Sequence, residues 1–282
     1  MPYTAEISRT NPTAFLIMID QSYSMSEPFG AGQGSKAEEA ARVLNRVLTD
    51  LTIKCAKGDD QIYDYFDVGV MGYGHTVGNA LTGPLGGSLF QPISRIGENP
   101  ARIDTVTKKI PDGAGGLVEE VVSLPVWIDP ASNGHTPMCR ALQLAHSAIS
   151  SWISTHPNAF PPTVLNITDG ESTDGDPTIP ATELASITTS DGNVLVFNCH
   201  ISGTSGRGPL FPASADNLTN PLAINLFEIS SELPTKHREL AQSEGVDAPP
   251  GSRGFAYNAD LVDLTIFLEV GTRLRSVSAE IR

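Results

Sequence analysis

The sequence has little that would bind nucleic acid or an anionic membrane surface. Its 282 residues include 18 Lys and Arg against 32 Asp and Glu, a formal net charge of −14. Nucleic-acid affinity depends on clustered positive charge, and an acidic surface repels anionic lipid headgroups. The basic pair Lys108-Lys109 is expected on a solvated helix face. The composition therefore predicts no nucleic-acid and no membrane partner, and favours a protein partner with a basic rim and one acidic anchor.

Cysteine is also scarce, with three residues, Cys55, Cys139 and Cys199, and no C-x-x-C pair. An odd number of widely spaced cysteines argues against a disulfide framework and predicts a reducing compartment. Cys199-His200 together with Cys139 makes a zinc site conceivable. Adjacent Cys and His rarely supply a tetrahedral set, so ordinary buried thiols are the favoured interpretation.

Long apolar runs are missing as well. No stretch approaches the ~20 apolar residues that a membrane-spanning helix needs. Residues 1–6 show no basic region followed by an apolar stretch, and neither end carries a lipidation pattern. Together with the cysteine pattern, these features lead us to expect a cytoplasmic protein.

What the sequence does contain is an alternation of buried strands and amphipathic helices. Apolar runs predict strands over 14–19, 66–73, 163–168, 194–198 and 224–230, with a short antiparallel edge strand over 81–85. Helical spacing predicts helices over 36–56, 137–156, 180–189, 234–244 and 258–274; Ser35 and Glu38 form a capping box before the first of these. The order predicts an α/β fold, a doubly wound, mainly parallel sheet with helices on both faces and one antiparallel edge strand. We expect one domain over 1–282, with its core at about 13–270.

Residues 86–133 fit this alternation less well and are interpreted as an insertion near the carboxyl ends of the strands. Within it we expect a short helix over 99–110, a glycine-rich loop over 113–116 and an extended or hairpin segment over 117–128. The high apolar content favours a packed excursion at the sheet edge over a specificity loop beside a binding site.

Three oxygen-bearing side chains follow the first strand directly. Asp20, Ser22 and Ser24 form a D-x-S-x-S motif at the end of the apolar run 14–19. In open α/β sheets, ligands bind outside the carboxyl ends of the strands. Oxygen ligands with few charges suit Mg²⁺, Mn²⁺ or Ca²⁺ rather than zinc or copper. The motif therefore predicts a site for a hard divalent cation.

Two further segments supply matching groups. Thr136 lies in a loop before Pro137 and an apolar helix, and Asp169 ends the strand over 163–168. The acidic stretch 169–176 lacks the EF-hand spacing, so apart from Asp169 its residues are expected to shape a polar turn, with Glu171 as an outer group.

In this order, D-x-S-x-S, T-P-M and T-D-G resemble a von Willebrand factor A (vWA) domain with a metal-ion-dependent adhesion site (MIDAS). The resemblance spans roughly residues 13 to 270. It implies that Asp20, Ser22, Ser24, Thr136 and Asp169 hold the metal: the hydroxyls bind it directly and the two Asp residues often act through water. A carboxylate from a partner protein would fill the open coordination position. One departure is Gly134-His135-Thr136 where the family usually has Gly-Gly-Thr; the favoured interpretation of His135 is an exposed loop residue, and a contact to the ligand is the alternative.

Within that family, T-P-M and T-D-G-E-x-T-D are similar to stand-alone bacterial cytoplasmic forms of the TerY type. Some of these are encoded with a protein kinase and a protein phosphatase in stress-response or tellurite-resistance systems. The resemblance therefore implies a phosphosignalling partner.

Other chemistries fit the sequence less well. Gly30-x-Gly32-x-Gly34 is followed by Ser35-Lys36, which matches neither the dinucleotide fingerprint nor the P-loop. Asp20 as a phosphoryl-accepting nucleophile would need a D-x-D motif, and no G-x-S-x-G elbow supports a serine hydrolase.

The sequence therefore predicts a non-enzymatic, Mg²⁺-dependent adaptor (Mn²⁺ or Ca²⁺ being the other candidates) that binds a partner's Glu or Asp. Neutral hydroxyl ligands leave a bound cation with net positive charge, and no positioned base would activate water. The alternatives are a Mg²⁺-dependent phosphoryl-transfer or hydrolytic enzyme, and a structural vWA module whose metal site is unused.

Overall fold

A seven-stranded sheet runs through the centre of the computed structural model, which describes residues 2–30, 34–58, 61–111, 116–202 and 208–272. The strand order is β13-β12-β9-β1-β4-β5, and β6 also pairs with β4. The pairs β13/β12, β12/β9, β9/β1 and β1/β4 are parallel, whereas β5 and β6 run antiparallel to β4. The strands are β1 (Thr13–Asp20), β4 (Phe66–Tyr73), β5 (Val77–Asn79), β6 (Phe90–Pro92), β9 (Thr163–Thr168), β12 (Leu195–Ile201) and β13 (Phe255–Ala259). The predicted mainly parallel sheet with an antiparallel edge is confirmed.

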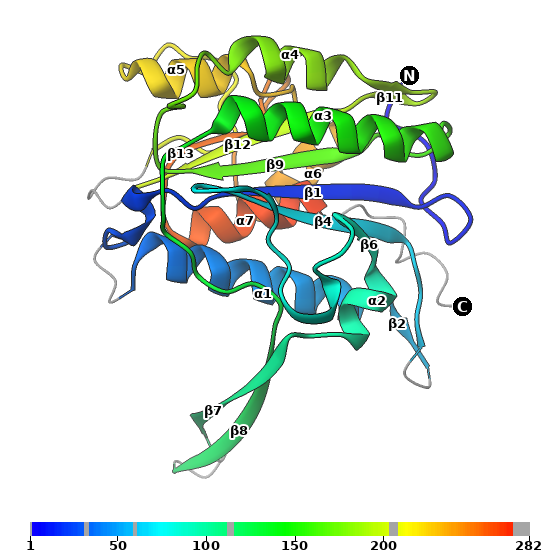
Figure 1. The fold of residues 1–282 in the computed structure, drawn as a ribbon, viewed down its shortest axis with the longest axis vertical. Helices are drawn as coiled ribbons and strands as arrows, with labels where there is room; N and C mark the ends of the chain where they lie inside the picture. The colour runs from blue at the N-terminus through cyan, green and yellow to red at the C-terminus, as the bar shows by residue number, and fades with distance from the viewer. Residues whose placement is uncertain (1, 31–33, 59–60, 112–115, 203–207, 273–282) are drawn as a thin grey trace.

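Helices cover both faces of this sheet (Figure 1). One face carries α3 (Met138–Thr155), α4 (Thr178–Ser186) and α5 (Pro221–Glu228). The other carries α1 (Lys36–Cys55), α2 (Ile93–Glu98), α6 (Thr235–Ser243) and α7 (Leu261–Thr272). The sheet is therefore doubly wound, as predicted, with a hydrophobic core on each side.

Strand β1 shows why a continuous apolar run marks the middle of such a sheet. Its residues alternate between the two cores: Phe15, Ile17 and Ile19 pack on the α1 side, and Ala14, Leu16 and Met18 pack on the α3 side. All eight residues of the strand are buried. Because both faces need apolar side chains, no polar residue interrupts the strand until Asp20 at its end.

Helix α1 begins at the predicted capping box. Ser35 Oγ accepts the backbone N–H of Glu38 at 3.2 Å, and the Glu38 carboxylate accepts the backbone N–H of Ser35 at 2.8 Å. These two bonds satisfy N–H groups that the first turn of a helix leaves without partners. The cap fixes where the helix starts, and Lys36 is its first residue.

The predicted helix over 99–110 is wrong. After α2, residues 102–111 form strand β7 (Arg102–Pro111), which pairs antiparallel with β8 (Leu117–Val126) in a two-stranded hairpin. Lys108 and Lys109 therefore lie in a strand and not on a helix. The extended segment predicted over 117–128 is confirmed, and the glycine-rich loop over 113–116 falls mostly outside the described residues. The hairpin projects away from the sheet (Figure 1), so no sheet or helix face imposed a readable burial pattern on β7.

The base of this hairpin is tied to α1 by one side chain. Asn45 Oδ1 accepts the backbone N–H groups of Trp127 and Ile128 at 2.8 and 3.1 Å, and Asn45 Nδ2 donates to the carbonyl of Ile128 at 2.9 Å. Trp127 and Ile128 are each 1% exposed. A single amide thus satisfies three backbone groups in a segment that no strand partner reaches.

Asn45→Ala is expected to lower the free energy of unfolding by about 2 kcal/mol, because it leaves poorly solvated backbone groups without partners. Urea denaturation would measure the loss. Asn99→Ala is the matched control, since Asn99 is only half-buried and its amide donates to a single carbonyl, that of Arg95. Equal effects of the two substitutions would contradict the anchoring role of Asn45.

The C-terminal third also departs from the expectation. Residues 224–230, predicted as the last strand, belong to α5 and the turn after it. The last strand is β13, which ends inside the first residues of the helix predicted over 258–274. Asn220 caps α5 by accepting the backbone N–H of Leu222 at 2.8 Å, and Pro221 occupies the first helical position. Asn before Pro is a helix-start signal, which outweighs the short apolar run that follows it.

The remaining elements are short. The predicted edge strand over 81–85 is wrong, since the antiparallel partner at that end of β4 is β5 and residues 83–85 form the 3-10 turn η2 (Gly83–Leu85). The others are the 3-10 turn η1 (Tyr23–Ser26) and the strand pairs β2 (Ala56–Lys57) with β3 (Gln61–Ile62) and β10 (Thr188–Thr189) with β11 (Gly192–Asn193). Among the described residues, no helix has the length and hydropathy to cross a bilayer.

Candidate metal site

Three loops at the carboxyl ends of β1 and β9 and before α3 come together, and they are the loops that carry the predicted site residues. The backbone N–H of Asn133 donates to Gln21 O at 2.6 Å, and that of Tyr23 donates to Gly134 O at 3.0 Å. These bonds join the loop after β1 to the loop before α3. The latter is joined in turn to the loop after β9, where Thr136 and Thr173 exchange bonds: Thr136 N–H donates to Thr173 Oγ1 at 3.0 Å, and Thr173 N–H to Thr136 O at 2.9 Å.

Hydrogen bonds that involve their side chains link four of the five predicted residues, Asp20, Ser22, Ser24 and Asp169. Ser22 Oγ and Ser24 Oγ lie 3.0 Å apart, and Ser24 Oγ donates to Asp169 Oδ1 at 2.7 Å. Asp20 Oδ1 accepts the backbone N–H of Ser22 at 2.9 Å. Residues 145 positions apart in sequence thus meet at one point, because the carboxyl ends of neighbouring parallel strands lie together.

Thr136, the fifth residue, is brought to this cluster by its backbone. It is 5% exposed, and the bonds described above place its loop against both of the others. Among the described residues no hydrogen bond joins its hydroxyl to the other four. Its neighbour His135 is exposed on the same loop, as the favoured interpretation had it.

Two glycines allow the loops to approach this closely. Gly134 has φ +89°, and a Cβ there would lie 2.5 Å from the backbone nitrogen of His75. A Cβ on Gly74, directly after β4, would lie 2.5 Å from Gln21 O and 2.6 Å from Asn133 O. Both positions therefore require glycine, the first for its backbone conformation and for space, the second for space alone.

Asp20 is the most enclosed group of the site, with 0% exposure. Its second oxygen, Oδ2, accepts the hydroxyl of Thr168 at 2.8 Å. Burial raises the pKa of Asp20 to about 6, and the hydrogen bonds from Ser22 and Thr168 oppose that rise because they favour the carboxylate. The protein thus holds a carboxylate in a poorly solvated place, where a cation would interact with it strongly.

Lys36 is a member of this site that the sequence reasoning missed. Its side chain is 5% exposed, and Nζ donates to Asp169 Oδ2 and to Glu27 Oε2, each at 2.8 Å. Asp169 therefore accepts Ser24 on one oxygen and Lys36 on the other. The segment that contains Lys36, Gly34-Ser35-Lys36, matches no phosphate-binding motif, and no local pattern indicates that the first residue of α1 faces inward.

His200 also borders the site from β12. It is 7% exposed, it stacks on Tyr257 with ring centroids 4.7 Å apart, and burial lowers its pKa to about 4. The sequence reasoning placed Cys199-His200 after a strand, whereas both residues lie within β12. Cys55, Cys139 and Cys199 are free buried thiols, and the described residues contain no group of three His, Cys, Asp or Glu side chains that could hold a metal.

Asp174, in the acidic stretch after β9, stabilises the start of α3. Asp174 accepts the backbone N–H groups of Cys139 and Arg140 at 3.0 and 2.9 Å, in the first turn of α3. Although burial opposes it, these bonds lower the pKa of Asp174. This carboxylate caps α3 from another loop and so holds the Thr136 loop against the loop after β9.

The chemistry of the site fits a hard divalent cation. In an octahedral site with metal–oxygen bonds of about 2.1 Å, neighbouring ligand oxygens lie roughly 3 Å apart. Ser22 Oγ and Ser24 Oγ have that spacing. Because Ser24 gives its proton to Asp169, Ser22 is the donor in the bond between the two serines, and one lone pair of Ser24 remains free to bind a cation. Ser22, Ser24 and Thr136 would be the hydroxyl ligands, with Asp20 and Asp169 behind them.

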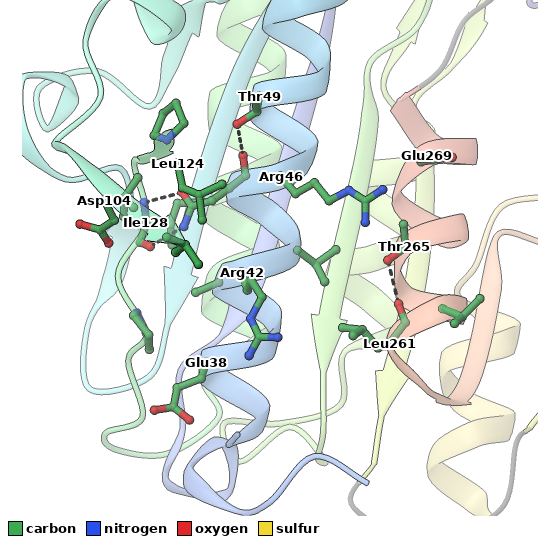
Figure 2. Close-up of a pocket in the computed structure, with 18 of the residues that line it drawn as sticks. Glu38, Arg42, Arg46, Thr49, Asp104, Leu124, Ile128, Leu261, Thr265 and Glu269 are labelled. Carbon is green, nitrogen blue, oxygen red and sulfur yellow. Dashed lines mark hydrogen bonds between the residues drawn. The ribbon is translucent and has the colours of Figure 1, made fainter. Parts of the chain in front are cut away.

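A separate groove of about 1080 Å³ lies between α1, α7 and the base of the β7–β8 hairpin (Figure 2). Figure 2 shows Glu38, Arg42 and Arg46 along α1, with Arg46 extending toward α7, which carries Leu261, Thr265 and Glu269. None of the five predicted site residues lines it. The groove and the candidate metal site are therefore different features of the molecule.

Comparison with known proteins gives likenesses of fold. No protein-family profile and no curated protein sequence matches the chain. Among solved structures, two of proximal thread matrix protein 1 from the mussel byssus are 14% identical, with TM-scores of 0.46 and 0.45, and each alignment covers 92% of this chain and 47% of the other. One of them has a zinc-occupied MIDAS motif. The pilus adhesin SpaC from Lactobacillus rhamnosus GG is 11% identical, with a TM-score of 0.45, over 94% of this chain and 30% of that one.

This chain therefore spans about half the length of the mussel protein and less than a third of the adhesin.

Proposed function

We propose that this chain is a divalent-metal-dependent protein interaction module of the vWA type, which binds an acidic side chain of a partner at the site formed by Asp20, Ser22, Ser24, Thr136 and Asp169. The observation that carries the proposal is the hydrogen-bonded series Ser22–Ser24–Asp169, formed between loops that lie far apart in sequence. The metal, with Mg²⁺ as the first candidate and Mn²⁺ or Ca²⁺ as the others, would supply a Lewis acid to which a carboxylate can bind.

The site residues have different roles, and these roles support the binding of an anionic ligand. Ser22, Ser24 and Thr136 would offer neutral oxygens, and Asp169 orients the Ser24 hydroxyl by accepting its proton. Neutral ligands neutralise little of a cation's charge, so an anionic ligand gains a strong bond at the remaining position. The partner that suits this site carries an exposed Glu or Asp.

The proposal includes two finer statements that rest on the sequence resemblance. The first is that the site binds without catalysing a reaction; measurable turnover of p-nitrophenyl phosphate or p-nitrophenyl acetate, lost in Ser22→Ala, would support the enzyme alternative instead. The second is that the partner is a kinase or phosphatase of a cytoplasmic bacterial stress-response system of the tellurite-resistance type. A genomic neighbourhood without either enzyme would remove the second statement.

Metal binding is best tested with the serines and not with the aspartates. The side chains of Asp20 and Asp169 are buried and hydrogen-bonded, so truncating either of them to alanine would disturb the fold as well as the site. Addition of MgCl₂ or MnCl₂ at about 100 times Kd is expected to stabilise the protein by about 2.7 kcal/mol. We expect Ser22→Ala and Ser24→Ala to lose most of that gain, measured by thermal denaturation with metal and with EDTA.

Ser26→Ala is the matched control. Ser26 lies in the same 3-10 turn as Ser24, but it is exposed and its hydroxyl donates to the carbonyl of Tyr23 at 2.7 Å. The same variants then serve in partner capture from native extract, in Mg²⁺ against EDTA. Capture that persists in EDTA and in Ser22→Ala/Ser24→Ala would overturn the proposal and leave the structural module as the better description.

A further inference from the structure

A buried ammonium group lies behind the candidate metal site. The Lys36 side chain is 5% exposed and bridges Asp169, whose side chain is fully buried, and Glu27, whose side chain is 64% exposed. Nζ also lies 3.5 Å from the carbonyl oxygen of Ser24. Burying a lysine is costly unless its charge is compensated, and here the compensation comes from a residue of the metal site itself.

Through Asp169, Lys36 is connected to a hydroxyl of the site. Lys36 donates to Oδ2 of Asp169, and Ser24 donates to Oδ1. With both oxygens engaged, the carboxylate is held in one orientation, and the Ser24 hydroxyl is held with its proton directed at Asp169. Lys36 is thus a positioning residue for Ser24, acting through Asp169.

Lys36 also determines the charge of the site. Asp20 and Asp169 contribute two buried negative charges and Lys36 one buried positive charge, whereas Glu27 is largely screened by water. The buried groups therefore carry one net negative charge. With a divalent cation added, they would carry one net positive charge, and without the Lys36 charge they would be neutral.

We propose that Lys36 sets the charge of the site for its two ligands: it weakens the affinity of the empty site for the metal and strengthens the affinity of the metal-loaded site for a carboxylate. This inference rests on the proposed function. Each effect follows from the same charge, because an ammonium group repels the cation and leaves the loaded site with an uncompensated positive charge. By linkage, a carboxylate that binds better to the loaded site must raise the metal affinity by the same factor.

Four proteins, the wild type and three variants, separate the effect of the Lys36 charge from the effect of its contact with Asp169. Lys36→Met leaves the buried groups with two negative charges, Asp169→Asn leaves them neutral, and Lys36→Met/Asp169→Asn restores the net charge of the wild type without any ion pair. The Mn²⁺ dissociation constant is measured by titration calorimetry in a buffer without carboxylates, and again with sodium acetate as the probe, against sodium chloride at equal ionic strength.

We expect Lys36→Met to bind Mn²⁺ about tenfold more tightly than the wild type in the absence of acetate. Asp169→Asn should bind Mn²⁺ more weakly, and the double variant should lie near the wild type. Acetate should tighten Mn²⁺ binding in the wild type and in the double variant, and by less in Lys36→Met. Glu27→Gln, which leaves the buried charge unchanged, should alter neither quantity by more than about twofold.

The outcomes distinguish this inference from the proposed function. If the wild type binds no divalent metal, the proposed function fails. If it binds metal and the affinities do not follow the buried charge, for example if Lys36→Met binds Mn²⁺ no more tightly than the wild type, the role of Lys36 is overturned and the proposed function stands. Should Lys36→Met not fold, the comparison of Asp169→Asn with the double variant still decides, because a purely structural Lys36 would not make the double variant the tighter binder.

Discussion

Gly74→Ala is expected to lower the free energy of unfolding by about 3 kcal/mol, in the upper range for overpacked sites. The added methyl group would lie 2.5 Å from Gln21 O and 2.6 Å from Asn133 O, and both contacts are with backbone. No rotation of a side chain relieves such a clash, so the loops after β1 and before α3 must move apart. Their mutual bond, Asn133 N–H to Gln21 O at 2.6 Å, would be lost with the movement.

The same movement should impair the candidate site, because Ser22 directly follows Gln21 and Thr136 lies three residues after Asn133. We therefore expect Gly74→Ala to lose the stabilisation by Mn²⁺ as well as intrinsic stability, in urea denaturation with and without metal. Gly78→Ala, four positions away, is the control: nothing lies within 4 Å of its Cβ position, so a change within about 0.5 kcal/mol is expected. If Gly74→Ala were as stable as Gly78→Ala, the tight approach of the two loops would be refuted.

A second large effect is expected at low pH from His237. This side chain on α6 is 1% exposed and packs against Phe160 and Phe197, with ring centroids 6.2 and 5.7 Å away. Within the described part of the chain, neither ring nitrogen has a hydrogen-bond partner. Burial, and to a smaller extent the charge of Lys236, lowers the pKa of His237 to about 4 from an ordinary 6.5.

Because the pKa of His237 is lower in the folded protein than in the unfolded chain, the folded state loses stability when the pH falls. Below pH 6.5 the unfolded chain takes up a proton at His237 and the folded protein does not until about pH 4. The folded state therefore loses stability as the pH falls through this window, by about 3 kcal/mol from this one residue. Above pH 6.5, where both states are neutral, the residue contributes no pH dependence.

His237→Leu should remove that dependence. We expect its stability at pH 7.5 to equal or exceed that of the wild type, because leucine buries no unpartnered nitrogen. Between pH 6.5 and 4.5 the difference between variant and wild type should widen by about 2 kcal/mol, measured by urea denaturation at each pH. His135→Leu, on an exposed loop, is the control; a difference that stays constant with pH for His237→Leu would contradict the assignment.

The strands and helices that were predicted correctly are those whose own residues show a clear hydrophobic pattern or a capping motif. The run 14–19 is apolar on both faces because it lies in the middle of the sheet, and the capping box of Ser35 and Glu38 marks the start of α1. Within the misassigned segments the residues carry no such signal, and the helix-start signal of α5, Asn220-Pro221, lies before the apolar run that was assigned. Residues 224–230 are a short apolar run, which periodicity cannot assign to helix or strand, and β7 belongs to a hairpin that leaves the core.

The sequence by itself determined the strands β1, β4, β9 and β12, the helices α1, α3 and α4 and the residues that end β1 and β9, because local hydrophobic pattern and capping depend on neighbouring residues. It therefore named Asp20, Ser22, Ser24, Thr136 and Asp169 as candidates. Only the tertiary structure decided that Lys36 turns inward to Asp169, that Asp174 caps α3 from another loop, and that Gly74 must have no side chain. These are contacts between segments far apart in the chain, and no local pattern encodes which way a side chain at the end of a helix will face.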